Sequence, residues 1–190
     1  MLLFWRSIFY NTNCKTNVAV QGKVFHKLKN SNELQRKMTF GGRKMSVLDQ
    51  IYAKAKEDPQ RVAFPEAENE KMMQAAYETG KEGYIIPILV GDAQKITELC
   101  KERGYETDVF KIVDIQEEEY KNKLIADYVA KPETLLKEKA LGRRMQNPLY
   151  YAMVMQAVGE AEVTFAGIDN TTGDVLLAGQ MIIGLQPGIR

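Results

Sequence analysis

Histidine is almost missing from this 190-residue sequence, and cysteine is scarce. The one histidine, His26, precedes residues 45–190, which therefore contain no imidazole for a Ser-His or Cys-His couple or for a histidine metal site. The two cysteines, Cys14 and Cys100, are too few for a disulfide framework and lack the spacing of metal ligands. The sequence thus argues against several enzyme classes, predicts no metal site, and is typical of a reduced, cytoplasmic protein.

Long apolar runs and nucleotide-binding signatures are also missing. No stretch reaches the roughly 18 apolar residues of a membrane-spanning helix, and the opening MLLFWRSIFY is interrupted by Arg6. Neither a Gly-Lys-Ser/Thr loop nor a GxGxxG motif occurs, which argues against a dehydrogenase lobe. No basic stripe with interleaved aromatic residues follows residue 44. We therefore expect no membrane and no nucleic acid as partners.

Charge divides the chain at the stretch FGGRKM, residues 40–45. Residues 1–44 contain nine Lys or Arg and one acid, a net charge of +8, whereas residues 45–190 contain 17 Lys or Arg and 24 Asp or Glu, a net charge of −7. An organellar targeting peptide, a basic binding arm and a non-native segment all fit the first part. The codons GGA-GGA-AGA-AAA-ATG would encode Gly-Gly-Arg-Lys-Met and spell a ribosome-binding site before a start codon. We therefore expect translation to start at Met45 and residues 1–44 to be a non-native or disordered extension.

From Met45 onward, apolar periodicity predicts helices alternating with strands. The expected helices cover residues 46–57, 68–81, 92–103, 117–130, 133–145, 147–159 and 174–183. The expected strands cover residues 61–64, 84–92, 109–114 and 161–167. The second strand has the apolar run of a strand buried on both faces, although Pro87 is unfavourable in an interior strand. This alternation predicts a doubly wound, three-layer α/β/α domain with a mostly parallel sheet.

Two strand exits contain polar residues, and such sheets bind ligands at the carboxyl ends of their strands. The first exit, FPEAENEK at residues 64–71, places three acids at a helix start, where they complement the helix dipole without any ligand. The second exit, AGIDNTTGD at residues 166–174, brings Asn170, Thr171 and Thr172 to the start of the next helix. These side chains and free backbone N–H groups can hold a phosphate or acyl phosphate, and plain capping by Asn170 or a threonine is the alternative.

Three stretches together resemble the phosphate acetyl/butyryltransferase family, whose members interconvert acyl-CoA and acyl phosphate. The stretches are VAFPEAENEKMMQAA with YIIPILVGD, then MQNPLYYAMVMQAVGEAEVTFAGIDNTT, and finally GDVLLAGQMIIGLQPG. The resemblance implies that residues 45–190 are the N-terminal part of a two-lobed phosphate acyltransferase. It also implies coenzyme A or acyl-CoA and phosphate or acyl phosphate as substrates, acetyl as the acyl group, no bound cofactor, and a homodimer for the full-length enzyme.

Members of this family are roughly twice as long as residues 45–190. The resemblance places the catalytic residues in the other half, so we expect none in this chain and predict that the 190 residues are an inactive, truncated fragment. A non-catalytic α/β fragment or binding module is the alternative. Family members often have an arginine where this sequence has Lys131 and another where it has Leu177. Lys131 keeps the positive charge, so the resemblance implies a phosphate contact from it beside those from Asn170, Thr171 and Thr172.

Overall fold

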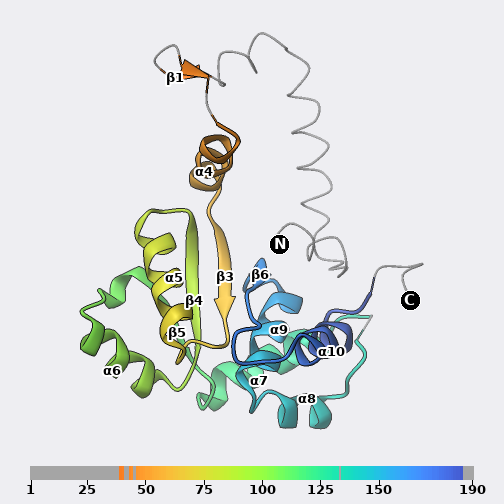
Figure 1. Ribbon diagram of the computed structural model, residues 1–190. Coiled ribbons are helices and arrows are strands. Elements are labelled where there is room, and N and C mark those ends of the chain that lie inside the picture. Colours follow the sequence, from red (N-terminus) through yellow and green to blue (C-terminus); the bar gives the residue numbers. More distant parts are fainter. Residues whose placement is uncertain (1–38, 41–42, 45, 133, 186–190) are drawn as a thin grey trace. The chain divides into compact units, whose positions relative to one another are not determined.

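The computed structural model describes residues 39–40, 43–44, 46–132 and 134–185 (Figure 1). The described residues belong to two compact units, one within residues 12–58 and one containing residues 59–185. The predicted start at Met45 and most of the predicted extension over residues 1–44 lie outside the described residues.

A short hairpin and one helix make up the described part of the first unit. Strand β1 (Thr39–Phe40) pairs antiparallel with β2 (Arg43–Lys44). Helix α4 (Val47–Glu57) begins after Ser46, whose Oγ accepts a hydrogen bond from the Asp49 N–H at 3.2 Å. The Asp49 carboxylate in turn accepts from the Ser46 N–H at 2.9 Å. This capping box satisfies two N–H groups at the helix start and confirms the helix predicted there.

Four parallel strands form the sheet of the second unit, in the order β5-β4-β3-β6 (Figure 1). They are β3 (Gln60–Phe64), β4 (Ile85–Gly91), β5 (Lys111–Asp114) and β6 (Val163–Thr164). Val62 of β3 pairs with Pro87 on one side and with Val163 on the other. The predicted parallel sheet is therefore confirmed, with Pro87 in an interior strand and β6 shorter than the predicted 161–167.

Helices cover both faces of this sheet (Figure 1). On one side lie α5 (Glu70–Lys81) and α6 (Ala93–Arg103). On the other lie α7 (Glu118–Val129), α8 (Glu138–Arg144), α9 (Pro148–Val158) and α10 (Thr172–Ile182). A short 3₁₀ helix, η2 (Thr107–Val109), precedes β5. Helix α8 starts five residues after the predicted 133, and α10 starts two residues before the predicted 174.

Alternate side chains of each strand enter the two cores of this three-layer arrangement. Val62 and Phe64 pack with Met72 of α5 and Ile96 of α6. Ala63, which lies between them in β3, packs instead in the core formed by α7, α8, α9 and α10. A sheet with an apolar core on each face is the doubly wound fold that the alternating helices and strands predict.

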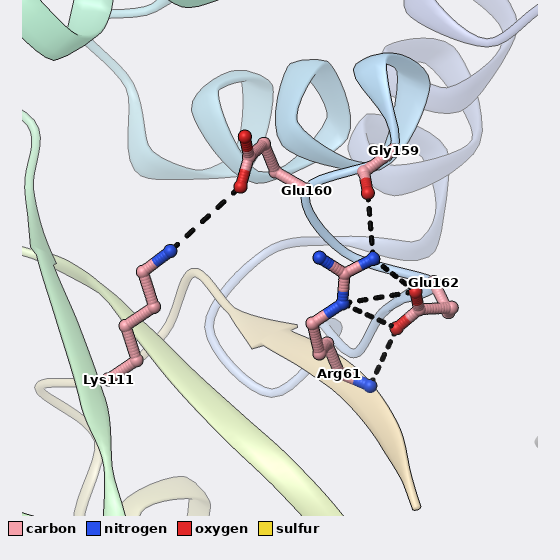
Figure 2. Close-up of polar contacts among 5 residues, drawn as sticks. All are labelled: Arg61, Lys111, Gly159, Glu160 and Glu162. Atoms are coloured by element: carbon pink, nitrogen blue, oxygen red, sulfur yellow. Dashed lines mark hydrogen bonds and ion pairs between the residues drawn. The ribbon is translucent and has the colours of Figure 1, made fainter. Parts of the chain in front are cut away.

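Polar contacts reinforce the pairing of β3 with β6 at their amino ends (Figure 2). The Nε of Arg61 donates to both carboxylate oxygens of Glu162, at 3.0 and 3.1 Å, and its Nη2 donates to the Gly159 carbonyl at 2.8 Å. Burial opposes ionisation of Glu162, but the hydrogen bonds from Arg61 hold the pKa of that carboxyl below its ordinary value. This clamp of Arg61, Glu162 and Gly159 fixes where the chain enters β6, and thereby where the loop after β6 begins.

Candidate active site

The strand order reverses between β3 and β6. From β3 the chain moves outward through β4 and β5, and it then returns to place β6 on the other side of β3. Ligands of doubly wound sheets bind at such a switch point, outside the carboxyl ends of the strands. The Phe165 N–H donates to the Ala63 carbonyl at 2.9 Å, so both strands end side by side. The two polar exits found in the sequence are therefore neighbours at the switch point.

Glu66 joins the two exits. It is the only buried charged residue in the part of the chain that the structure describes, with 5% of its surface exposed. Its carboxylate accepts hydrogen bonds from the N–H groups of Gly167 at 2.9 Å, Ile168 at 2.8 Å and Asn170 at 2.9 Å. The Asn170 side-chain Nδ2 donates a further hydrogen bond at 2.7 Å. The expectation of free N–H groups is therefore wrong for these three residues, because they already hold an anion.

The environment of Glu66 keeps its carboxyl ionised. Burial opposes ionisation, but the donors on Ile168, Asn170 and Gly167 outweigh it and lower the pKa below its ordinary value. Dipole complementation, which accounts for all three acids of this exit at the level of sequence, does not describe Glu66. The other two acids do lie on the surface, where Glu68 faces Lys95 at 3.9 Å and Glu70 pairs with Arg103.

Gly167 gives the loop the shape that surrounds this carboxylate. Its φ is +114°, a backbone conformation that residues with a Cβ rarely adopt. The Gly167 N–H reaches both oxygens of Glu66, at 2.9 and 3.1 Å. Glycine at position 167 therefore allows the positive φ with which the loop surrounds the Glu66 carboxylate.

A second contact ties the same two exits together. The Asn69 Nδ2 donates to the Asp169 carboxylate at 2.8 Å. The other side of the Asn69 amide caps α5, since its oxygen accepts from the Lys71 N–H at 3.1 Å. The start of α5 and the loop after β6 are thus held by one side chain.

The start of α10 follows directly. Thr171 is its N-cap, accepting from the Asp174 N–H at 3.2 Å and donating to the Asp174 carboxylate at 2.6 Å. Capping by a threonine, the alternative from the sequence, is therefore confirmed. Thr172 and Gly173 come next and are exposed. Their N–H groups belong to the first turn, which has no carbonyl inside the helix to accept them, and they lie at the positive end of the helix dipole.

The structure brings together three of the four predicted site residues. Asn170, Thr171 and Thr172 are consecutive between β6 and α10, with Asn170 engaged by Glu66 and Thr172 exposed. Lys131 lies elsewhere, because its Nζ donates to the carbonyl of Ala157 at the end of α9. Helix α9 leads into the amino end of β6, whereas the loop with Asn170 and Thr171 follows the carboxyl end of β6. Burial lowers the pKa of Lys131, and its phosphate contact stays a prediction that this position does not favour.

Leu177 also lies on α10, one turn after Gly173, and 49% of its surface is exposed. An apolar side chain here supplies neither the charge nor the donors of the arginine that the family often has. Among the described residues of this helix start, the donors that remain for an anion are backbone N–H groups and the hydroxyl of Thr172.

Within the part of the chain that the structure describes, no helix combines the length and the apolar composition that spanning a membrane requires. The His, Cys, Asp and Glu side chains of the same residues form no cluster of three or more that could bind a metal ion.

Comparison with known proteins places this geometry in context. The sequence is 30% identical over 150 residues to a phosphate acetyltransferase of Clostridium acetobutylicum, covering 77% of this chain and 44% of the relative. It is 25% identical to a phosphate acetyltransferase of Staphylococcus epidermidis, covering 68% of this chain and 39% of that protein. The chain thus spans less than half the length of these relatives.

Solved structures share the fold. The EutD phosphotransacetylase from Staphylococcus aureus superposes with a TM-score of 0.65 at 23% identity, over 75% of this chain and 43% of that one. A phosphotransacetylase from Streptococcus pyogenes superposes with a TM-score of 0.61 at 20% identity, over 77% and 45% of the two chains. A family model described as phosphate acetyl/butaryl transferase matches residues 46–190. This chain therefore belongs to the phosphate acetyl/butaryl transferase family.

Proposed function

We propose that this chain contributes the phosphate side of an acyltransferase site that interconverts acyl-CoA plus phosphate with acyl phosphate plus coenzyme A. The observation that supports this most strongly is the family match over residues 46–190. The geometry agrees with it, because the switch point ends in an exposed helix start that follows Thr171. We propose acetyl as the acyl group, since acetyltransferases are among the relatives.

The reaction makes specific demands on this site. The sulfur of coenzyme A attacks the carbonyl carbon of the acyl phosphate, a carbon–sulfur bond forms, and the carbon–oxygen bond to phosphate breaks. Negative charge develops on the carbonyl oxygen and on the leaving phosphate, and preorganised N–H donors stabilise such charge. The N–H groups of Thr172 and Gly173 and the hydroxyl of Thr172 would bind the phosphate oxygens. Binding both substrates side by side supplies a further part of the rate enhancement.

Substrates and partners follow from the same proposal. Coenzyme A acts as a substrate rather than a bound cofactor, and we assign no metal to the reaction. We assign no residue of this chain to the base that deprotonates the thiol. A cytoplasmic location, a homodimer of the full-length enzyme, and no role for nucleic acid or membrane complete the proposal.

A non-catalytic binding module is the second candidate, and one observation favours it. The chain covers only 39–44% of its relatives, so a single lobe would retain the phosphate contacts without the rest of the site. Both candidate functions predict that phosphate binds. Only the acyltransferase predicts turnover by the complete protein.

Turnover can be tested by measuring thiol release from acetyl-CoA in the presence of phosphate. We expect no turnover from the 190-residue chain and phosphate-dependent release from the complete reading frame that contains it. In that complete protein, replacing Thr171 and Thr172 by alanine should raise the KM for phosphate about tenfold. An inert complete protein, or a frame that ends at codon 190, would favour the binding module. An unchanged KM would remove the two threonines from the site.

A further inference from the structure

We propose that Glu66 is a positioning residue of the phosphate site: its carboxylate fills the ring of N–H groups in residues 167–170, and so confines a bound phosphate to the first turn of α10. This inference rests on the proposed function, because it concerns the phosphate of that reaction. It assigns a role to a residue that makes no contact with substrate.

The donors of the loop are already occupied by a carboxylate. The four donors on the loop, three backbone N–H groups and the Asn170 Nδ2, all end on the Glu66 carboxylate at 2.7 to 2.9 Å. Such a ring of converging N–H groups is the usual binding site for a phosphate oxygen. Here the chain supplies its own anion from 101 residues away.

The burial of Glu66 makes its carboxylate difficult to replace. Only 5% of Glu66 is exposed, so a phosphate could enter the ring only by displacing the carboxylate. A displaced carboxylate would lose its hydrogen bonds, and close to a phosphate it would also add a repulsion between like charges. Thr172 and Gly173 lie outside the ring, and both residues are exposed. A phosphate therefore binds there, beside the ring rather than in it.

The ring is joined directly to the start of α10. Asn170 holds Glu66, and the next residue, Thr171, caps α10. The direction in which Thr172 and Gly173 present their N–H groups is therefore set by Glu66 through two residues of backbone. Removing the charge at position 66 should loosen the loop and misdirect these donors.

The test uses the 190-residue protein, isotope-labelled for amide NMR and titrated with inorganic phosphate. In the wild type, phosphate should shift the amide signals of Thr172 and Gly173 and leave those of Gly167, Ile168 and Asn170 in place. This map requires no variant, so it holds even if a substitution prevents folding. Phosphate-induced shifts centred on the three ring amides would overturn the proposal.

The matched variants are Glu66→Gln and Glu68→Gln, which remove the same charge from a buried and an exposed position of one loop. In Glu66→Gln, hydrogen exchange at the three ring amides should accelerate and phosphate affinity should fall, each about tenfold or more, with the circular dichroism spectrum retained. Glu68→Gln should match the wild type in both measurements.

Wild-type exchange rates in Glu66→Gln, or equal weakening by Glu68→Gln, would contradict the assignment. If the wild type bound no phosphate at all, the proposed function would fail. In that case the confinement of phosphate would fail with it, while the exchange rates would still decide whether Glu66 holds the loop.

Discussion

The contacts of single residues at the candidate site centre on Glu66 and the loop that surrounds it. A buried carboxylate is unfavourable unless hydrogen bonds replace the water that it loses. Glu66 meets that requirement through Gly167, Ile168 and Asn170, all distant in sequence. The helix N-caps Ser46, Asp92 and Asn147 are different, because each side chain accepts from backbone N–H groups only two or three residues later in the sequence.

This difference explains which residues the sequence could identify. The helices that begin near Ser46 and Asp92 are predicted correctly, because each cap binds backbone N–H groups only two or three residues away. The loop at Asn170 is recognised by its composition. The role of Glu66 is not, because nothing near position 66 indicates that its partners lie about a hundred residues later.

The stability contributed by Glu66 should depend on pH. The folded-state pKa of this carboxyl is lowered, so its contribution is present above the unfolded-state pKa and is lost as pH falls through the folded-state pKa. At neutral pH, Glu66→Gln should reduce the free energy of unfolding by about 2–3 kcal/mol, because hydrogen bonds to a charged group are lost. Urea unfolding should show that the difference in free energy of unfolding between wild type and Glu66→Gln is smaller at about pH 3 than at neutral pH. A difference that grows with acid would refute the sign of the effect.

A pair of glycine substitutions separates backbone strain from packing. Gly167→Ala should destabilise by about 1–2 kcal/mol, because φ is +114° although no atom obstructs the added Cβ. Gly142→Ala, inside α8, meets only an ordinary contact with Ile125 at 3.6 Å and should stabilise by up to about 1 kcal/mol. Thermal unfolding monitored by circular dichroism would measure both. Equal effects of the two changes would contradict this explanation.

Among the elements, β4 departs most clearly from its sequence pattern. It lies between β5 and β3 although it contains Pro87, a residue that is unfavourable in an interior strand. The Ile115 N–H donates to the Gly91 carbonyl at 3.1 Å, so the backbone groups of Gly91 point toward β5. Alternate residues of a strand point their backbone groups the same way, so the nitrogen of Pro87 also points toward β5. That strand begins only at Lys111, opposite Ile88, so Pro87 forgoes no ladder hydrogen bond. The sequence cannot show this, because it does not reveal where the neighbouring strand starts.

Pro87 also fixes how closely α5 approaches the sheet. A Cβ added at Gly80 would lie 2.7 Å from the Pro87 Cγ and 2.9 Å from the Val109 Cγ1. Gly80→Ala should therefore lower the free energy of unfolding by about 1–3 kcal/mol, although replacing glycine by alanine in a helix interior ordinarily raises it. In the Pro87→Ala background the cost should fall, and a double-mutant cycle of urea unfolding would measure the coupling. A stabilising Gly80→Ala would show that the helix has room to move.

The amino-end clamp between β3 and β6 gives a prediction for element pairing. Arg61 binds Glu162 with two nitrogens and reaches the Gly159 carbonyl, a geometry that lysine cannot reproduce (Figure 2). Arg61→Lys should lower the free energy of unfolding by about 1 kcal/mol, a modest value because the guanidinium is partly exposed. Lys81→Met is the control, since its ion pair with Glu106 is on the surface. Equal losses from the two changes would mean that the forked geometry adds nothing.

For the whole molecule, the fold class follows from the sequence but the strand order does not. Alternating helices and strands predict a parallel sheet covered on both faces, and the structure confirms it. The placement of β6 beside β3 depends on long-range packing and on the Arg61–Glu162 clamp, which no local pattern records. The switch point, and with it the juxtaposition of the two polar exits, therefore becomes visible only in the fold.

The family assignment and the length of the match determine which part of the proposed function can be tested on this chain. Residues 46–190 match the family, yet the chain covers less than half of its relatives. In the proposed function, phosphate would bind at the start of α10, whereas turnover would also need coenzyme A and a base. The phosphate contact is therefore the part of the proposed function that the described residues can support by themselves.

Titration calorimetry of acetyl phosphate into the 190-residue protein tests that central claim most directly. We expect saturable binding with a Kd on the order of 1 mM, equivalent to about −4 kcal/mol. Thr172→Ala should weaken it about tenfold by removing a hydrogen bond to a charged group. Thr107→Ala, which alters an exposed threonine in η2, should leave the affinity unchanged. Absence of binding, or equal affinity in all three proteins, would contradict a phosphate site at the start of α10.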